Sequence, residues 1–155
     1  MKPTVYLETS IISYLTAWIG RDLIVAANHE TTREWWSLRK DEYDVYVSLA
    51  VVDESRFGDP EAARHREEVL IELPKLEIDD SVTALSKRLI TGVPLPPKAE
   101  TDALHIALAA VHGMKYLLTW NCTHIANAKL RLNIDAICRA AGYEPPVICT
   151  PLELL

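Results

Sequence analysis

Short runs of β-branched, aromatic and other apolar residues alternate along this chain with longer segments in which apolar residues recur at helical spacing. The short runs are typical of buried strands, and the longer segments are typical of helices with one apolar face. We expect strands at Thr4–Leu7, Val45–Ser48, Leu76–Ile78, Tyr116–Trp120 and Val147–Cys149. Strands that alternate with helices indicate an α/β fold with a central parallel sheet of about four to five strands flanked by helices.

The helical segments are bounded by residues that commonly begin or end helices. Asp59 and Pro60 suit a helix start, because Asp caps the exposed N–H groups and Pro fits the first turn. Gly20, Gly92 and Gly113 follow apolar segments and suit helix ends. The predicted helices cover residues 11–18, 31–40, 49–57, 60–73, 81–91, 98–112 and 127–141. The clearest of them is 98–112, for which we expect a buried stripe of Leu104, Ala107, Leu108 and Val111.

The length of 155 residues suits one domain with a core, which we expect to span residues 1–155. The longest apolar stretch, Ala103–Leu118, is interrupted by two histidines and a lysine, so we expect no membrane-spanning helix. Glu8 ends the first apolar run early, which argues against a signal peptide. The three cysteines have no paired spacing, which indicates reduced thiols and a cytoplasmic protein.

The net charge of −6 argues at first against a nucleic-acid partner. The acidity is concentrated in residues 41–80, which carry 13 acidic and 4 basic side chains. An acidic protein can still bind RNA phosphates when metal ions supply the positive charge, but it should not bind RNA tightly without metal. Trp35, Trp36 and Trp120 could stack on bases, although packing in the core is the favoured interpretation.

Four polar residues are placed where a parallel sheet binds ligands, beyond the carboxyl ends of its strands. Glu8 follows the first predicted strand, and Asn121 follows the fourth. Glu54 lies in the helix after the second strand, and Asp102 lies in the first turn of the 98–112 helix. Carboxylates that converge repel each other, which raises the pKa of at least one of them and favours a hard cation such as Mg²⁺ or Mn²⁺.

Each of these residues also has a structural interpretation. Glu8 and Asp102 could each stabilise the start of a helix, where an anion is favoured. Glu54 could be solvated, and Asp53 competes with it, because neighbours on a helix point ~100° apart. Asn121 could serve as a turn residue. Taken singly, the four residues indicate only an α/β protein with a possible acidic site.

Other polar side chains near these positions could support such a site. The hydroxyls beside it, which could orient water or phosphate or simply cap and pack, are Thr9, Ser10 and Thr119. His105 lies one turn after Asp102 and could hydrogen-bond that carboxylate, although a structural histidine is the favoured interpretation. His124 could position a phosphate or bond within its own loop. Cys122 and His124 suggest zinc only weakly, because no second pair has ligand spacing.

Three segments resemble the PIN-domain superfamily, in its branch of VapC-type toxin ribonucleases. These segments are YLETSIISYLTA at residues 6–17, VSLAVVDESRFGD at 47–59 and DALHIALAAVHGMKYLLTWNCTHIAN at 102–127. The resemblance implies a PIN-like domain in which Glu8 is the first acid, Glu54 the second and Asp102 the third. Asn121 stands where many members have a fourth acid. These residues are the implied catalytic set, and Glu8, Glu54 and Asp102 are the implied ligands of Mg²⁺ or Mn²⁺.

The sequence departs from that family pattern at two positions. Most members have Asp at the first position, whereas Glu8 is one methylene longer. A carboxylate displaced by about an ångström can change the rate ~10²-fold. Asn121 offers a carbonyl oxygen but no charge, which favours one firmly held ion over two.

The resemblance implies a metal-dependent endoribonuclease that acts as the toxin of a type II toxin–antitoxin pair. The implied partners are an RNA substrate, an antitoxin and a second copy of the chain in a homodimer. The alternative is a PIN-fold module with a weakened site, which binds RNA or a protein without cleavage. A phosphotransferase with an aspartyl nucleophile fits poorly, because Ser10 stands where its second acid is needed.

Overall fold

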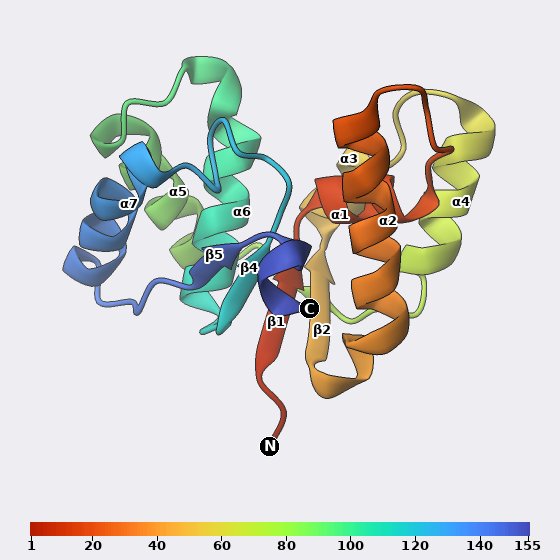
Figure 1. Ribbon diagram of the computed structural model, residues 1–155. Coiled ribbons are helices and arrows are strands. Elements are labelled where there is room, and N and C mark those ends of the chain that lie inside the picture. Colours follow the sequence, from red (N-terminus) through yellow and green to blue (C-terminus); the bar gives the residue numbers. More distant parts are fainter.

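The computed structural model describes residues 1–155 and contains a five-stranded parallel sheet in the order β3-β2-β1-β4-β5 (Figure 1). The strands are β1 (Thr4–Leu7), β2 (Asp44–Ser48), β3 (Lys75–Leu76), β4 (Tyr116–Leu118) and β5 (Val147–Cys149). The predicted α/β class and parallel sheet are therefore confirmed. The third strand is shorter than predicted and pairs with β2 only through Val47–Lys75 and Ser48–Leu76.

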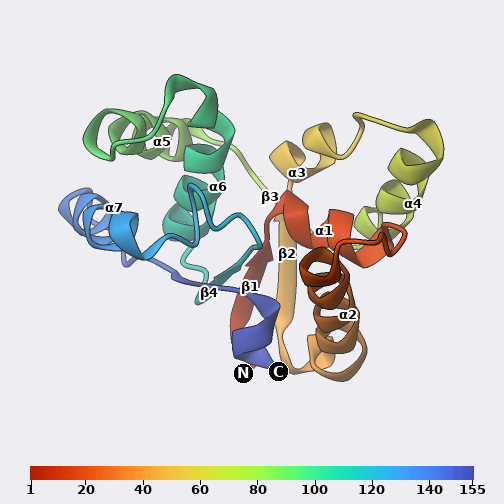
Figure 2. The same cartoon turned by 45° about the horizontal axis from the view of Figure 1, so that its top comes forward.

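Seven helices form two groups on opposite sides of the sheet, with α1 to α4 on one side and α5 to α7 on the other (Figure 2). Their bounds are α1 (Thr9–Thr16), α2 (Leu23–Leu38), α3 (Leu49–Glu54), α4 (Pro60–Leu70), α5 (Asp80–Gly92), α6 (Glu100–Val111) and α7 (Ala128–Ala140). Short 3-10 helices occur at Lys40–Glu42, Pro97–Ala99 and Pro151–Leu154. None of these helices has the length and apolar character needed to cross a bilayer.

The central strand β1 determines where a site can form. It pairs with β2 on one side and with β4 on the other, so Val5 lies opposite both Val45 and Tyr116. The chain builds the sheet outward from β1 in one direction and then in the other. In such sheets ligands bind beyond the carboxyl ends of the strands, at the point where that direction reverses. Glu8, which follows β1 directly, therefore lies at the position that the topology favours for binding.

The helix α6 is buried more extensively than its predicted stripe. Leu104 and Val111 are only half-buried, whereas seven of its residues are buried, namely Ala103, His105, Ile106, Ala107, Leu108, Ala109 and Ala110. The physical reason is that α6 packs on β4 and also against α5 and α3, so more than one face is covered. Its alanines allow these elements to approach closely, and an amphipathic stripe was therefore too narrow a prediction.

Several helix boundaries differ from the prediction: α3 and α4 each end three residues early, and the differences at α2 and α1 have local reasons. The helix α2 begins at Leu23 and not at Thr31, because Asp22 caps it by accepting hydrogen bonds from two backbone N–H groups of its first turn. Its first residues are apolar but exposed, so the spacing of apolar residues there does not show the helical pattern of one buried face. The helix α1 ends at Thr16, which leaves Trp18 outside it and 87% exposed. The prediction that this helix extends to Trp18 was wrong.

The three cysteines are unpaired, as predicted, but they differ in exposure. Cys122 is exposed, whereas burial raises the pKa of the Cys138 thiol to about 11 and that of Cys149 to about 12. Because the thiolate is the reactive form, we expect one thiol to react rapidly with Ellman's reagent at pH 8 and two more to react only after unfolding. A Cys122→Ser variant should lose the rapid phase. Three rapidly reacting thiols in the native protein would contradict this packing.

Candidate functional site

Two carboxylates and an imidazole converge at the carboxyl edge of the sheet. Glu8 follows β1, Glu54 ends α3, and His105 lies in α6. One donor atom from each of the three residues lies within 4.8 Å of the other two. Glu8 is 5% exposed and His105 is fully buried, while the side chain of Glu54 is 36% exposed. The predicted convergence of Glu8 and Glu54 is thus observed, and His105 joins them.

Glu8 is held by two hydroxyl groups. Ser10 Oγ donates to Glu8 Oε1 at 2.5 Å, and Thr119 Oγ1 donates to the same oxygen at 2.6 Å. Each hydroxyl also accepts a backbone N–H, from Trp120 and Asn121 respectively, so its own proton is free to point at the carboxylate. No protein group hydrogen-bonds Glu8 Oε2. Although Glu8 stands at the N-cap of α1, its side chain makes no capping bond, so the capping interpretation fails.

Glu54 is held in a similar way. Thr9 Oγ1 donates to Glu54 Oε1 at 2.5 Å, and His105 Nε2 lies 2.6 Å from that oxygen. Burial raises the pKa of Glu54, but the hydrogen bonds from His105 and Thr9 and the attraction of His105 outweigh it, so the pKa is lowered. The expected rise through carboxylate repulsion does not occur at this residue. Asp53 is exposed and pairs with Arg56 at 3.1 Å, so Glu54 is the acid that faces the site.

A buried hydrogen-bond chain reaches Glu54 through His105. The Tyr6 hydroxyl lies 2.7 Å from His105 Nδ1 and 2.8 Å from Ser48 Oγ, which in turn accepts the backbone N–H of Val51. Burial raises the pKa of Tyr6, so its phenol keeps its proton. With a proton on Nε2, the ring accepts from Tyr6 and donates to Glu54, and every group in the chain is satisfied.

The hydrogen bond between His105 and Asp102, which was the less favoured interpretation of His105, is absent. Both ring nitrogens of His105 are used by Glu54 and Tyr6, because the ring turns toward the sheet. Asp102 Oδ2 instead lies 2.8 Å from His124 Nδ1. Asp102 is not one of the three converging residues, and no backbone N–H of α6 donates to its side chain.

Asn121 organises the loop that carries His124. Its side-chain oxygen accepts the backbone N–H of His124 at 3.1 Å, and its backbone carbonyl accepts those of Ile125 and Ala126. The turn interpretation of Asn121 is therefore observed, with its amide oxygen engaged within the protein. The His124 ring bonds Asp102 and not its own loop, and no protein group bonds its Nε2. Cys122 belongs to no group of metal-binding side chains, so the zinc interpretation gains no support.

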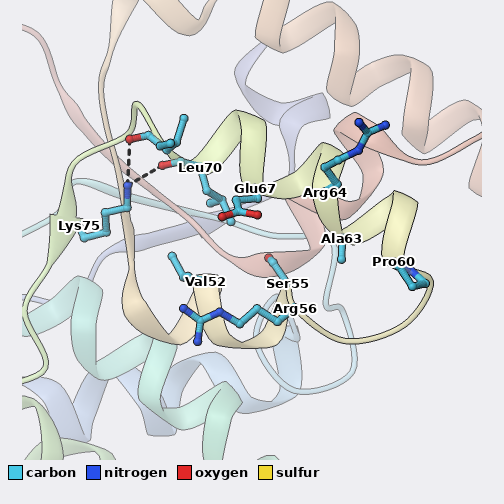
Figure 3. A pocket seen from close by; sticks show the side chains of 10 residues that line it. Val52, Ser55, Arg56, Pro60, Ala63, Arg64, Glu67, Leu70 and Lys75 are labelled. Atoms are coloured by element: carbon cyan, nitrogen blue, oxygen red, sulfur yellow. Dashed lines mark hydrogen bonds between the residues drawn. The ribbon is translucent and has the colours of Figure 1, made fainter.

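A separate cavity of about 400 Å³ lies between α3 and α4 (Figure 3). Val52 of α3 lines it, together with Ser55 and Arg56 just after that helix, and none of the three converging residues borders it. Lys75 borders the cavity, and its Nζ donates to the backbone carbonyl of Leu70 at 2.6 Å, at the carboxyl end of α4. The cavity is thus distinct from the carboxylate site.

The fold and the site together define an α/β domain with converging carboxylates at the carboxyl edge of a parallel sheet. The sequence matches the family model described as PIN domain over residues 5–121, and the chain belongs to this family. The fold is similar to that of a chain in the crystal structure of VapBC2 from Rickettsia felis bound to a DNA fragment from their promoter. That similarity has a TM-score of 0.60 at 14% identity and covers 95% of this chain and 98% of the other. No curated protein sequence matches significantly.

Two connections of the site were missed from the sequence, namely the bond from His105 to Glu54 and the support of His105 by Tyr6. A signal for the first was present, because His105 interrupts the apolar segment ALHIALAA of a helix that is otherwise buried. A histidine inside such a helix needs buried partners for both ring nitrogens. The sequence could not show that these partners come from β1 and α3.

Removal of the Tyr6 hydroxyl tests the buried chain. We expect Tyr6→Phe to lower the free energy of unfolding by about 1–3 kcal/mol, because His105 Nδ1 and Ser48 Oγ lose a buried partner. Tyr46→Phe on the neighbouring strand removes a hydroxyl without a hydrogen bond and should change stability by less than about 0.5 kcal/mol. Urea unfolding of both variants measures the difference. Equal losses of unfolding free energy in the two variants would argue against the buried hydrogen-bond chain from Tyr6 to Glu54.

Proposed function

We propose that this chain is a metal-dependent endoribonuclease and the toxin of a type II toxin–antitoxin pair. The observation that carries the proposal is the convergence of Glu8 and Glu54, each held at Oε1 with no protein hydrogen bond to Oε2. Buried carboxylates with a free oxygen suit a hard divalent cation. Membership of the PIN domain family supports a nuclease.

The proposed ion is Mg²⁺ or Mn²⁺. Glu8 and Glu54 would bind it through their free oxygens, and Asp102 would add the third carboxylate, directly or through water. When bound, such an ion polarises a phosphodiester and lowers the pKa of the water that it carries. The net charge of −6 gives a physical reason for the proposed dependence on a metal ion, because acids without a cation repel the phosphates of RNA.

The side chains around the acids would keep them in place during cleavage. Ser10 and Thr119 fix Glu8, and Thr9 and His105 fix Glu54, so neither carboxylate must reorganise when RNA binds. His124 is fixed through Asp102 and Asn121 and has Nε2 free, which supports a contact from this nitrogen to a substrate phosphate.

The partner proposal rests on a weaker similarity. The Rickettsia felis structure contains a VapBC2 complex, and its fold resembles this chain over nearly the full length. This similarity supports an antitoxin as the partner that silences the enzyme. A homodimer is the proposed state of the toxin itself.

One observation favours a second function. The side-chain oxygen of Asn121 is occupied by the His124 N–H, so the position where many members have a fourth acid offers the ion neither charge nor a free oxygen. A PIN-fold module that binds RNA or a protein without cleavage is therefore the alternative.

The two functions differ in their response to metal and to Asp102→Asn. If the chain is a nuclease, cleavage of single-stranded RNA should require Mg²⁺ or Mn²⁺, stop with EDTA and fall below detection in Asp102→Asn, which removes a charge at constant volume. Asp53→Asn is the matched control and should cleave normally, because Asp53 is exposed and pairs with Arg56. A gel-based cleavage assay and a melting curve for each variant suffice.

Two outcomes would change the assignment. If the wild-type protein binds a broad panel of RNAs but cuts none with either metal, the binding module replaces the nuclease. If Asp102→Asn is strongly destabilised, its loss of activity reflects a structural pair with His124, and Asp102 loses its proposed role.

Glu8→Asp tests whether the site is built around the longer acid. Glu8 reaches both Ser10 and Thr119, and a side chain shortened by one methylene cannot keep both contacts at 2.5–2.6 Å. We therefore expect a loss of cleavage rate of roughly 10²-fold under single-turnover conditions. A higher rate in Glu8→Asp would show that the glutamate weakens an ancestral aspartate site.

A further inference from the structure

His105 occupies a place in the site that its role as a partner of Glu54 does not fully explain. The residue is fully buried, and its Nε2 points at the space in which the two carboxylates converge. A donor for Glu54 alone is already present, because Thr9 provides one at 2.5 Å. A ring nitrogen of His105 and a carboxylate oxygen of Glu8 also lie within 4.8 Å of each other, and Glu8 is 5% exposed and has Oε2 unpartnered.

We propose that His105 Nε2 is itself a ligand of the divalent ion, which makes the site two carboxylates and one imidazole. This inference rests on the proposed metal dependence and deepens it. Oxygen ligands alone suit Mg²⁺, whereas an imidazole nitrogen suits Mn²⁺ and other transition metals better. The site should therefore select Mn²⁺ over Mg²⁺ more strongly than an all-carboxylate site does.

The surroundings of His105 match those of a metal-binding histidine. Such a residue commonly donates its second ring N–H to a fixed oxygen, which sets the orientation of the ring. Here the Tyr6 oxygen lies 2.7 Å from Nδ1 and is itself fixed by Ser48. In the loaded site His105 carries its proton on Nδ1 and donates it to Tyr6, which leaves the lone pair of Nε2 for the metal. The hydrogen bond from Nε2 to Glu54 is then given up, and Thr9 remains the donor that holds Glu54.

The imidazole also compensates for a missing ligand. Asn121 carries no charge, and its amide oxygen already accepts the backbone N–H of His124. His105 supplies a donor from α6 without adding a charge, so Glu8 and Glu54 meet no further repulsion. The ligand set thus differs from one made of acids alone in both charge and chemical softness.

Pulsed electron paramagnetic resonance of the full chain loaded with Mn²⁺ tests the proposal directly. We expect a ¹⁴N coupling typical of a directly bound imidazole in the wild-type protein, its loss in His105→Gln and its retention in His112→Gln. His112, the C-cap residue of α6, bonds the backbone carbonyl of Glu77 and serves as the matched control. The wild-type protein with bound Mn²⁺ and no ¹⁴N coupling would overturn the proposal even if His105→Gln fails to fold.

A second variant identifies the nitrogen independently. The coupling should remain in His124→Gln, because His124 faces Asp102 and not the three converging residues. If the coupling disappears in His124→Gln and persists in His105→Gln, the ligand is His124 and the proposal is wrong.

Calorimetric titration gives the selectivity. We expect His105→Gln to weaken Mn²⁺ binding at least about 10-fold and to weaken Mg²⁺ binding less. The ratio of the Mn²⁺ affinity to the Mg²⁺ affinity should therefore fall. Equal weakening for both ions would reduce His105 to a support for Glu54. The two proposals can fail separately. A protein that shows the ¹⁴N coupling but cuts no RNA would support His105 as a metal ligand and contradict the nuclease proposal. A protein that cuts RNA without the coupling would support the nuclease proposal and contradict His105 as a ligand.

Discussion

A buried carboxylate must be hydrogen-bonded, and the way in which Glu8 meets this requirement organises the rest of the site. An unpaired charge in the interior costs several kcal/mol, so Glu8 depends on the hydroxyls of Ser10 and Thr119. Both hydroxyls accept backbone N–H groups from the segment after β4, which ties the path of that segment to the carboxylate. The same segment continues through Asn121 to His124 and so to Asp102. The position of the third acid therefore follows, through a series of hydrogen bonds, from the first.

The second constraint is the repulsion between neighbouring acids. Two charges separated by about 5 Å repel by roughly 3 kcal/mol at an effective dielectric constant of about 20. At Glu54 the hydrogen bonds of His105 and Thr9 outweigh burial, and the pKa is lowered in spite of Glu8 nearby. Donors from α1 and α6 thus favour the ionised form of Glu54 in the folded protein. Carboxylates fixed in this way would need little reorganisation to hold the cation that we propose.

The sequence alone predicted the elements that follow from local chemistry. Runs of β-branched and aromatic residues located the strands, and the position of Glu8 after a strand located the first acid. The start of α2 was missed because Leu23 and Ile24 are apolar yet exposed, so they obscure the helical spacing of the buried residues. The link from Tyr6 through His105 to Glu54 joins β1, α6 and α3, which are distant in the chain. No local pattern contains such a contact, and only the packing of α6 against the sheet creates it.

The two departures from the common PIN pattern make physical sense together. Glu8 is longer than aspartate, and its extra methylene lets one oxygen reach both Ser10 and Thr119. Asn121 carries no charge, and its amide oxygen fixes the backbone of His124, whose ring then engages Asp102. The charge lost at Asn121 lowers the repulsion that Glu8, Glu54 and Asp102 must bear without an ion. A neutral nitrogen at His105 restores a donor without restoring that repulsion. If the site holds the proposed cation, the two departures would change which cation it prefers without removing the two carboxylates that hold it.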